Sequence, residues 1–542
     1  MKYILLITVL ISTKFLTAQT IENIEKANLL YQKKNWIEAS KAYEGLVKLN
    51  PTKGDYLYKL ATSLRKEKKY KSSMQAYKKS LTIGYKKGRC IYFIASINAS
   101  LGNEDEALKW VKIGLKTPKS IYYNDLNKED FKNLKSLSAF KALYPLEKKE
   151  ATRLERWSTD LDFFKMAFET IHFNLHRKVS KSDWEQGIVD ITNTIQILTD
   201  DEIVTKLMQL VAKLGDGHTF VRPPLQGINK LKFYPIQLYQ FKEGVYVTAI
   251  NETHKDVVGA KLTHIEGISI SEVLTKFKTV VSVDNAMGYK ENTYLTMLAE
   301  VLHNIGVTKN KTVANFTFEK ATGENIELNI RALDFNPALW NSVLQSDKEL
   351  PLYRSNPRKY FWHKYLPEKN AVYLQLNINF SMPNKDIEVY YNEVFAFMQK
   401  KEVKHLILDI RNCPGGNSFN NKPLLEHILQ NKHLQDKGNF YTIIGRKTFS
   451  AAMNLATDLE QRTNTIFVGE PTGSSPNFVG ETNFVELPYS KLNVSISNAY
   501  WQRSVSWDSR HWIAPDIFIE PTFRAYKNND DPVLEFILNT ID

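Results

Sequence analysis

The sequence predicts a multidomain protein of mixed α + α/β class, in which helical segments precede a β-rich module and an α/β core. Three observations predict this order. A 34-residue period runs through residues 19–120, and residues 230–335 alternate between apolar and polar side chains as strands do. Short apolar runs separated by glycine turns and helical patterns then occupy residues 336–542. A chain of 542 residues has enough material for about three or four domains of ordinary size.

The N-terminus has the pattern of a signal peptide. Lys2 precedes an apolar run from Tyr3 to Leu16, and Ala18 follows. The run is too short to span a membrane, but it suits the apolar region of a secretory signal with cleavage after Ala18. We therefore expect residues 1–18 to be removed. The mature protein is expected to be exported, to the periplasm or the extracellular space, without a transmembrane segment.

Charge and cysteine content exclude several classes of function. The formal charge of +13 is spread over lysine-rich segments without arginine–aromatic clusters, which favours solvated helix faces over a nucleic-acid partner. Cys90 and Cys413 fall in different predicted domains, so we expect no disulfide, and two cysteines alone do not make a structural zinc site. The sequence contains neither a P-loop nor a His-Glu-x-x-His helix. No cofactor or metal is predicted.

Residues 19–120 predict an array of paired helices. Small residues recur where paired helices would touch, and bulky ones recur where the next pair would stack. The three columns in register are Ala27, Ala61 and Ala95; Ala39, Ser73 and Ala107; and Tyr43, Tyr77 and Val111. This pattern resembles three tetratricopeptide repeats. The resemblance implies a protein partner bound by the repeats, although a purely structural appendage remains open.

The middle of the chain predicts a linker, a helical subdomain and a β module. Residues 121–150 are expected to form a capping or linker helix, and residues 151–229 are expected to be a helical subdomain. That subdomain ends in a glycine turn carrying His218, which could be a structural histidine or a functional one. Residues 230–335 resemble a PDZ-like module, with a helical insertion at about 284–306.

The α/β core, residues 336–542, contains a serine at a strand-to-helix turn. The apolar run Leu406–Ile410 ends at the glycine turn 412–417, and a second run ends at Gly445 before Ser450 opens a helical segment. The positive end of the helix dipole would favour loss of the serine proton. The amides of Ala451 and of the Gly415-Gly416 turn could bind an oxyanion. The alternative is that Ser450 only caps the helix.

Three motifs in this core resemble a known family. The segments ILDIRNCPGGN, GRKTFSAAMNLA and IFVGEPTG are similar, in order and spacing, to the core of the C-terminal processing peptidases and tricorn-type serine peptidases. The resemblance implies an α/β peptidase core, a polypeptide substrate, Ser450 as nucleophile, and oxyanion donors at Gly415, Gly416 and Ala451. Ser475 occupies the place of the catalytic lysine of the processing peptidases, so a serine–lysine dyad is not expected.

The resemblance implies that a histidine is the general base instead. His218 falls on the position of the tricorn-type base, although Gly217 stands where such sequences often carry serine. The acid that orients the histidine is expected at Asp508. Three other readings remain open: Glu470, Asp516, or a surface pair between Asp508 and Arg510.

Two hypotheses for function follow. The first is a secreted serine endopeptidase that forms an acyl-enzyme on Ser450, with His218 as general base. The second is an inactive peptidase-fold scaffold that recruits partners through its repeats, because a fold alone does not establish an activity.

Overall fold

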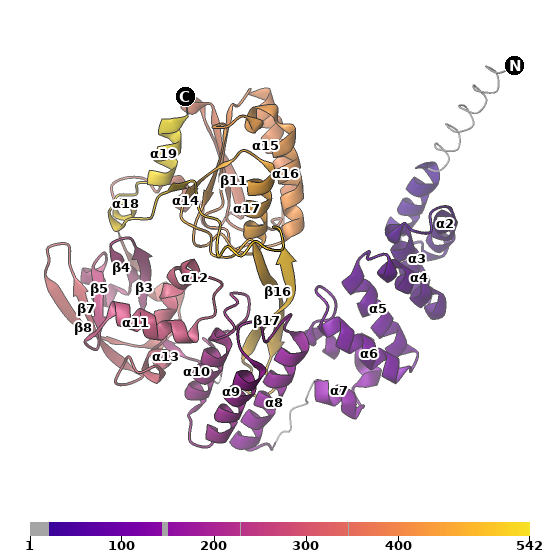
Figure 1. Cartoon of the computed structure of the whole chain (residues 1–542), viewed down its shortest axis with the longest axis horizontal. Coiled ribbons are helices and arrows are strands. Elements are labelled where there is room, and N and C mark those ends of the chain that lie inside the picture. Colours follow the sequence, from indigo (N-terminus) through magenta and orange to yellow (C-terminus); the bar gives the residue numbers. More distant parts are fainter. Residues whose placement is uncertain (1–20, 144–149, 228, 345, 542) are drawn as a thin grey trace. The chain divides into compact units, whose positions relative to one another are not determined.

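The computed structural model describes residues 21–143, 150–227, 229–344 and 346–541. The predicted signal peptide, residues 1–18, lies outside the described residues. The chain divides into two compact units, which Figure 1 shows coloured along the sequence. The first comprises the chain up to Glu150, Asp162–Phe173 and Asn483–Pro488; the second comprises Ala151–Leu161, Asn174–Thr482 and Tyr489–Asp542. Within the described ranges, no helix combines the length and the apolar character needed to cross a membrane.

The first unit is an array of consecutive helices that pack on one another. Residues 21–32 are helical, and the helices that follow are α2 (Trp36–Leu49), α3 (Gly54–Lys66), α4 (Tyr70–Thr82), α5 (Lys87–Ser100) and α6 (Glu104–Leu115). Each 34-residue period therefore corresponds to one pair of helices. All nine residues of the three sequence columns are 0% exposed. The period thus marks the positions at which the helices bury their contacts.

The segment after α6 does not form the single helix that the sequence pattern predicts. It folds as two short 3-10 helices, Tyr123–Asn127 and Glu129–Leu134, followed by α7 (Ser138–Leu143). The Asp125 carboxylate accepts the backbone N–H of Tyr122 at 2.9 Å, and such a local side-chain contact competes with a continuous helix. Residues 144–149, which include Pro145, lie outside the described residues.

Three longer helices lead to the predicted histidine: α8 (Arg153–Ile171), α9 (Lys181–Thr194) and α10 (Asp200–Ala212). A reciprocal capping box between Thr199 and Glu202 begins α10, and its apolar face is buried at Leu207, Leu210 and Val211. The helix ends at Ala212, and Gly215, whose φ is +55°, permits the sharp turn into residues 216–219.

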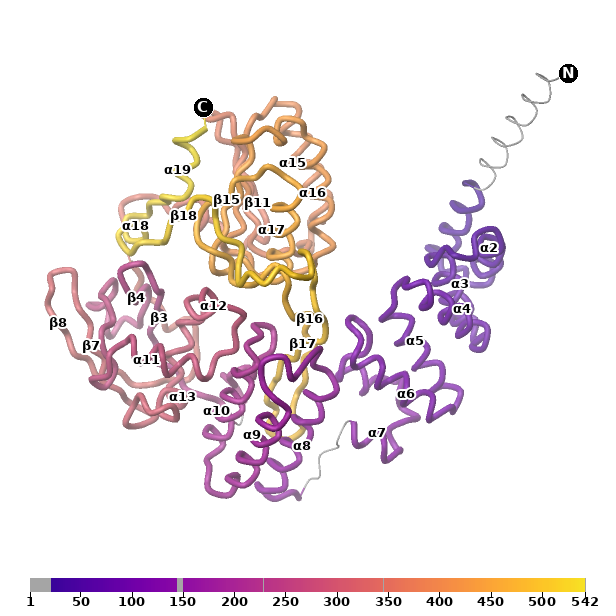
Figure 2. The backbone as a smooth tube through the Cα atoms, viewed as in Figure 1, coloured from indigo at the N-terminus to yellow at the C-terminus, as the bar shows by residue number. Residues whose placement is uncertain are grey.

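A β module follows, as the alternating pattern predicts. Its main sheet has the path β10-β4-β5-β7-β8, with β3 and β6 paired to β4 and β5. The strands are β3 (Ile236–Phe241), β4 (Gly244–Ile250), β5 (Lys261–Ile265), β6 (Ile268–Ser269), β7 (Val313–Glu319), β8 (Asn325–Arg331) and β10 (Ser342–Val343). Figure 2 traces this module with the helices α11 (Ile270–Phe277), α12 (Ala286–Glu291) and α13 (Ala299–Asn304). The helical insertion is therefore present, and the PDZ-like assignment stays a prediction.

The core is a six-stranded sheet of order β11-β12-β13-β14-β15-β18, parallel except for β11. The strands are β11 (Phe361–Leu366), β12 (Ala371–Leu376), β13 (His405–Asp409), β14 (Phe440–Ile444), β15 (Ile466–Gly469) and β18 (Ile517–Phe518). Strands β12, β13 and β14 are buried along their whole length. Near-continuous apolar runs of this kind are typical of parallel strands covered on both faces.

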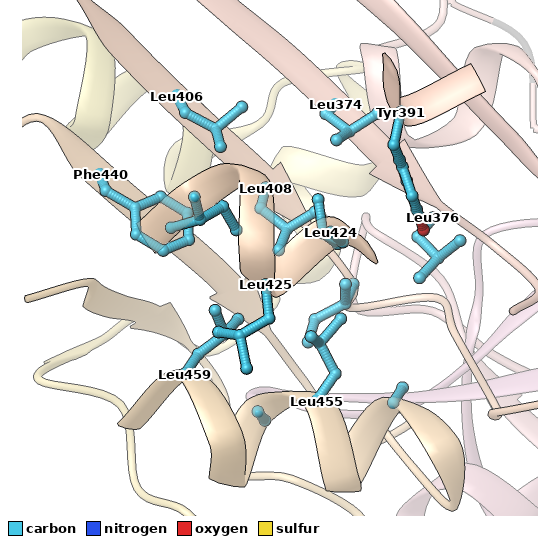
Figure 3. Packing of buried hydrophobic residues seen from close by; sticks show 14 of the residues in the cluster. Leu374, Leu376, Tyr391, Leu406, Leu408, Leu424, Leu425, Phe440, Leu455 and Leu459 are labelled. Atoms are coloured by element: carbon cyan, nitrogen blue, oxygen red, sulfur yellow. The ribbon is translucent and has the colours of Figure 1, made fainter. Parts of the chain in front are cut away.

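Helices cover both faces of this sheet. Alternate side chains such as Leu406 and Leu408 pack with α15 (Ile387–Lys400), α16 (Asn421–Gln430) and α17 (Ala451–Arg462), as Figure 3 shows. The intervening side chains, such as Ile407, pack with α19 (Pro532–Thr540). The loops that leave the carboxyl ends of β13 and β14 carry the glycine turn and Ser450.

A small third sheet fixes the histidine segment within the second unit. Strand β1 (Phe220–Val221) pairs with β17 (Asn493–Gln502), and β17 pairs with β16 (Asn477–Glu486). Phe220 lies opposite Ser495 in this ladder. Phe220 and Val221 are therefore tied to a hairpin of the α/β core, and the Ser495 hydroxyl of that hairpin also donates to the His218 carbonyl, 277 residues earlier in the chain.

Candidate active site

Ser450 occupies a strained turn at the start of α17. Its backbone has φ 54° and ψ −120°, a conformation that non-glycine residues avoid and that costs about 1–3 kcal/mol. Its side chain makes no capping hydrogen bond to the helix. The structure therefore does not support the reading of Ser450 as a helix cap. A serine on a strained strand-to-helix turn presents its hydroxyl outward, as nucleophilic serines do.

The glycine turn packs directly against this serine. Gly415 has φ +116°, and a Cβ there would lie 2.5 Å from the Ser450 Cβ and 2.9 Å from the Ala451 nitrogen. Gly416 has φ +143°, and a Cβ there would lie 2.5 Å from the Asn379 carbonyl oxygen. Only glycine fits at either position. The backbone of the turn thus lies close to both the serine side chain and the first amide of α17.

His218 lies beside the segment that carries Ser450. Its ring stacks on Phe449 with centroids 4.4 Å apart and on Phe478 with centroids 5.3 Å apart. Its main chain is held at both ends, because its N–H donates to Asp216 Oδ1 at 2.9 Å and its carbonyl accepts the Ser495 hydroxyl at 2.6 Å. The side chain is 8% exposed.

Both ring nitrogens of His218 are buried, and neither has a hydrogen-bond partner among the described residues. Buried polar atoms are rarely left in this state in a folded protein, and an exception of this kind often marks a reactive group. The contact between His218 and the Ser450 segment is made through the Phe449 ring. A hydrogen bond from Ser450 to the imidazole is not formed, and catalytic hydrogen bonds of this kind often tighten only when substrate binds.

Two carboxylates lie beside Gly217, immediately before the histidine: Asp216, which is buried, and Asp284, which is partly buried. Asp284 accepts the Gly217 N–H at 2.8 Å and also the Ser474 hydroxyl. Asp216 accepts the His218 N–H and the Thr219 hydroxyl. Burial, and then the negative charge of Asp216, raises the pKa of Asp284, while His218 and the two hydrogen bonds act in the opposite direction.

Asp284 is the acidic residue that the sequence analysis missed. It lies at the start of the helical insertion, 66 residues after His218, and no motif surrounds it. Next to it, Asn285 caps α12 and donates to the carbonyl oxygens of Thr472 and His511. These two bonds attach the insertion to the α/β core and hold Asp284 at the histidine turn.

Asp508, the acid predicted to orient His218, is bound elsewhere. Both of its carboxylate oxygens accept hydrogen bonds from the Arg510 guanidinium, and Arg510 also pairs with Glu460. The hydrogen bond from Arg510 holds the pKa of Asp508 well below its usual range. Because the ring nitrogens of His218 have no partner in the described chain, the expected Asp508–His218 contact is not made. The surface pair with Arg510, which the sequence left open, is what the structure contains.

Glu470 and Asp516, the other two candidates for the acid that orients His218, also have other partners. Glu470 forms a buried, two-pronged pair with Arg446, at 3.0 and 2.6 Å. Asp516 accepts the backbone N–H of Phe467 at 2.8 Å. Neither carboxylate is bonded to His218, so Asp284 and Asp216 are the acids that the fold brings to the histidine turn.

A cavity of about 610 Å³ opens at the carboxyl ends of β14 and β15. Its walls include Tyr239, Glu291, Tyr353 and the Arg446–Glu470 pair. Arg446 also donates to the Gln240 carbonyl at 2.7 Å, which joins the β module to the loop before Ser450. Neither Ser450 nor His218 lines this cavity, so it lies apart from the two reactive groups of the candidate site.

Comparison with known proteins gives similarities of structure only. No family model and no curated protein matches the sequence. Mature CPAF complexed with lactacystin is similar at 11% identity over 71% of this chain and 97% of that chain, with a TM-score of 0.49. The photosystem II D1 C-terminal processing protease is similar at 13% identity over 70% and 97%, with a TM-score of 0.34. The tricorn protease is similar at 13% identity over 70% and 36%, with a TM-score of 0.33.

The photosystem II D1 C-terminal processing protease and the tricorn protease have the names of the two kinds of peptidase that the three core motifs resemble. With identities of 11–13% and TM-scores below 0.5, these similarities do not assign an activity.

Proposed function

We propose that this chain is a serine peptidase that hydrolyses polypeptides through an acyl-enzyme on Ser450. The observation that carries the proposal is the strained turn at Ser450, with the Gly415 backbone against the serine and an unpartnered imidazole stacked on the preceding residue. These are the parts that acyl transfer requires: a nucleophile, a base, and donors for an oxyanion.

In the proposed cycle, His218 takes the hydroxyl proton of Ser450 as the serine oxygen attacks the substrate carbonyl carbon. The N–H groups of Ala451 and of Gly415 or Gly416 donate to the oxyanion of the tetrahedral intermediate. The C–N bond then breaks, and the proton held by His218 passes to the leaving amine. Water, deprotonated by the same imidazole, attacks the acyl carbon and releases the carboxylate product and the free serine.

The two carboxylates support the histidine in this cycle. Asp216 and Asp284 fix the peptide groups on both sides of Gly217, and negative charge near the imidazole stabilises the protonated ring that forms in each half of the reaction. Asp508 has no part in the proposed proton transfer, because Arg510 holds it.

A fluorophosphonate probe tests the proposal, because it reacts with a serine only where a base and oxyanion donors activate the hydroxyl. We expect labelling of the wild-type protein and of Ser475→Ala, a matched control serine in the same unit. Labelling should be lost in Ser450→Ala and in His218→Ala. If the folded wild-type protein takes up no label and cleaves no casein, the chain is the inactive scaffold of the second hypothesis.

We further propose that the protein is exported and that its repeats bind a protein partner. The apolar run that follows Lys2 supports export, and a mature N-terminus at Gln19, read by Edman sequencing of the secreted protein, is the expected result. The buried 34-residue columns support a tetratricopeptide-like array. The PDZ-like module would hold a chain end by strand addition.

A further inference from the structure

Three large aromatic side chains are exposed on segments that build the candidate site. Phe380, Phe419 and Trp507 are 50%, 74% and 80% exposed. Single exposed apolar residues are ordinary, but a group of them beside a reactive centre marks a binding surface. We call these three residues the aromatic rim.

Phe380 lies next to the glycine turn. Asn379 pairs in parallel with Gly416, its N–H donates to the Gly415 carbonyl at 2.9 Å, and its own carbonyl accepts the Asn417 N–H at 2.8 Å. The residue after Asn379 is therefore fixed along the edge of the turn that packs against Ser450.

Phe419 is fixed against the first turns of α17. It lies in the 3-10 helix Ser418–Asn420, and the Asn454 amide of α17 donates to the Ser418 hydroxyl at 2.9 Å. Two residues after Phe419, the Asn421 amide donates to the Ala451 carbonyl at 2.9 Å. Phe419 thus sits beside the helix end that Ser450 opens.

Trp507 lies on the histidine side. Its loop is anchored by Asn477, whose amide nitrogen donates to the Val505 carbonyl and whose amide oxygen accepts the N–H groups of Arg503 and Ser504, each at 2.9 Å. Asn477 directly precedes Phe478, the ring that stacks on His218. The Asp508–Arg510–Glu460 pairs fasten the other side of Trp507 to α17.

We propose that the aromatic rim binds large apolar side chains of the substrate polypeptide on both sides of the scissile bond. Phe380 and Phe419 belong to the segments that contact the Ser450 turn, and Trp507 belongs to the segment next to His218. A substrate chain laid across Ser450 would therefore reach rim residues on both sides of the serine. The anchoring segments of the rim are held by main-chain hydrogen bonds of Asn379 and by side-chain hydrogen bonds of other asparagines, and such preorganised aromatic anchors contribute most to binding. The substrate class is then an extended, unfolded segment rich in aromatic and large aliphatic residues. This inference rests on the proposed peptidase function.

Quenched fluorescent peptides that differ only in the residues flanking the cleaved bond test the preference. We expect kcat/KM for peptides with Phe or Leu at these positions to exceed that for Ser or Gly peptides by at least 10-fold. Phe419→Ala and Trp507→Ala should each reduce kcat/KM for the apolar peptides by about 10-fold, mainly through KM, and so narrow the difference in kcat/KM between the apolar and the Ser/Gly peptides. Ile197→Ala and Phe518→Ala, which truncate side chains 81% and 61% exposed elsewhere on the same unit, are matched controls and should change neither.

A binding measurement separates this inference from the peptidase proposal. Ser450→Ala protein is titrated into the same labelled peptides, and fluorescence anisotropy reports binding without cleavage. If the apolar peptides bind more tightly and the preference disappears in Ser450→Ala/Trp507→Ala, the rim is confirmed even where the wild type cleaves nothing. Cleavage or binding that is indifferent to the flanking residues overturns the rim and leaves the peptidase proposal standing.

Discussion

Gly415→Ala is the substitution whose effect on the site is best defined by the structure. The new Cβ would lie 2.5 Å from the Ser450 Cβ and 2.9 Å from the Ala451 nitrogen. Ordinary contacts begin at 3.4 Å, so the turn and the serine must separate by about 0.9 Å (3.4 − 2.5). The atoms that must move are the nucleophile and one of the two groups of amides proposed to hold the oxyanion.

Gly415→Ala should lose most of its kcat, whereas its loss of stability should leave the protein folded. A displacement of about 1 Å in a catalytic constellation costs roughly 100-fold, and loss of one oxyanion donor costs about 100- to 1,000-fold in kcat. An alanine at a φ near +116° costs about 1–2 kcal/mol of unfolding free energy, whatever surrounds it. We therefore expect kcat to fall at least 100-fold in a protein that remains folded.

Gly438→Ala is the matched control. Gly438 has φ +94°, and a Cβ there meets nothing within 4 Å, so the substitution carries the backbone cost without the collision. Urea unfolding should show the backbone cost in both variants, with a further loss in Gly415→Ala from the collision, and only Gly415→Ala should lose kcat with a fluorescent peptide and its fluorophosphonate label. Wild-type kcat in a folded Gly415→Ala protein would refute the placement of the turn against the serine.

Three further perturbations have defined outcomes. Ser450→Gly should be more stable to urea than Ser450→Ala by about 1 kcal/mol, because residue 450 has φ 54°, and both variants should be inactive. Equal stabilities of the two variants would mean that the turn is unstrained. Burial raises the pKa of Asp284 above its ordinary 3.8, so its contribution to stability is present at low pH and is lost as the pH rises through the folded pKa. Asp284→Asn should therefore flatten the fall of the urea midpoint above pH 4. Arg510 lowers the pKa of Asp508, which contributes stability above pH 3.8 that is lost on acidification, so Asp508→Asn should flatten the fall of the urea midpoint at acid pH. Arg446→Met leaves Glu470 buried without its partner and should lower the free energy of unfolding by about 3 kcal/mol. Removing both charges together should cost less than the sum of the two single changes. Additive losses in urea unfolding would contradict the pairing.

The elements that could be predicted from the sequence are those specified by local patterns. The apolar run that begins at Leu406 lies in β13 (His405–Asp409), and the run that ends at Gly445 lies in β14 (Phe440–Ile444). The 34-residue columns are buried in the first unit for the same reason, since each residue type repeats where the same contact repeats. Ser450 at a strand-to-helix turn also follows from its neighbours in sequence, because the run before it and the helical face after it are both short-range signals.

The carboxylates near the histidine could not be predicted in this way. Asp284 reaches the turn because Asn285 binds two carbonyl groups of the core, 187 and 226 residues further along the chain. Asp508 stands a few residues before Pro515-Asp516, where the family resemblance implies an acid, but Arg510, two residues away, forms a strong local pair with it. A position in a motif specifies where a residue lies along the chain, but it does not specify which neighbouring group its side chain binds.

Gly217 and Phe449 are best understood as one arrangement. Tricorn-like sequences often carry serine at the position of Gly217, and its absence counted against a working site. In the structure, a Cβ at Gly217 would lie 3.0 Å from the Phe449 ring, which is also the ring that stacks on His218. A side chain at 217 would displace the aromatic ring that connects the histidine to the serine segment. Asp284 holds the Gly217 amide from the other side. The missing hydroxyl is therefore not a sign of decay, because the space it would need is filled by the contact that brings His218 to the residue before Ser450.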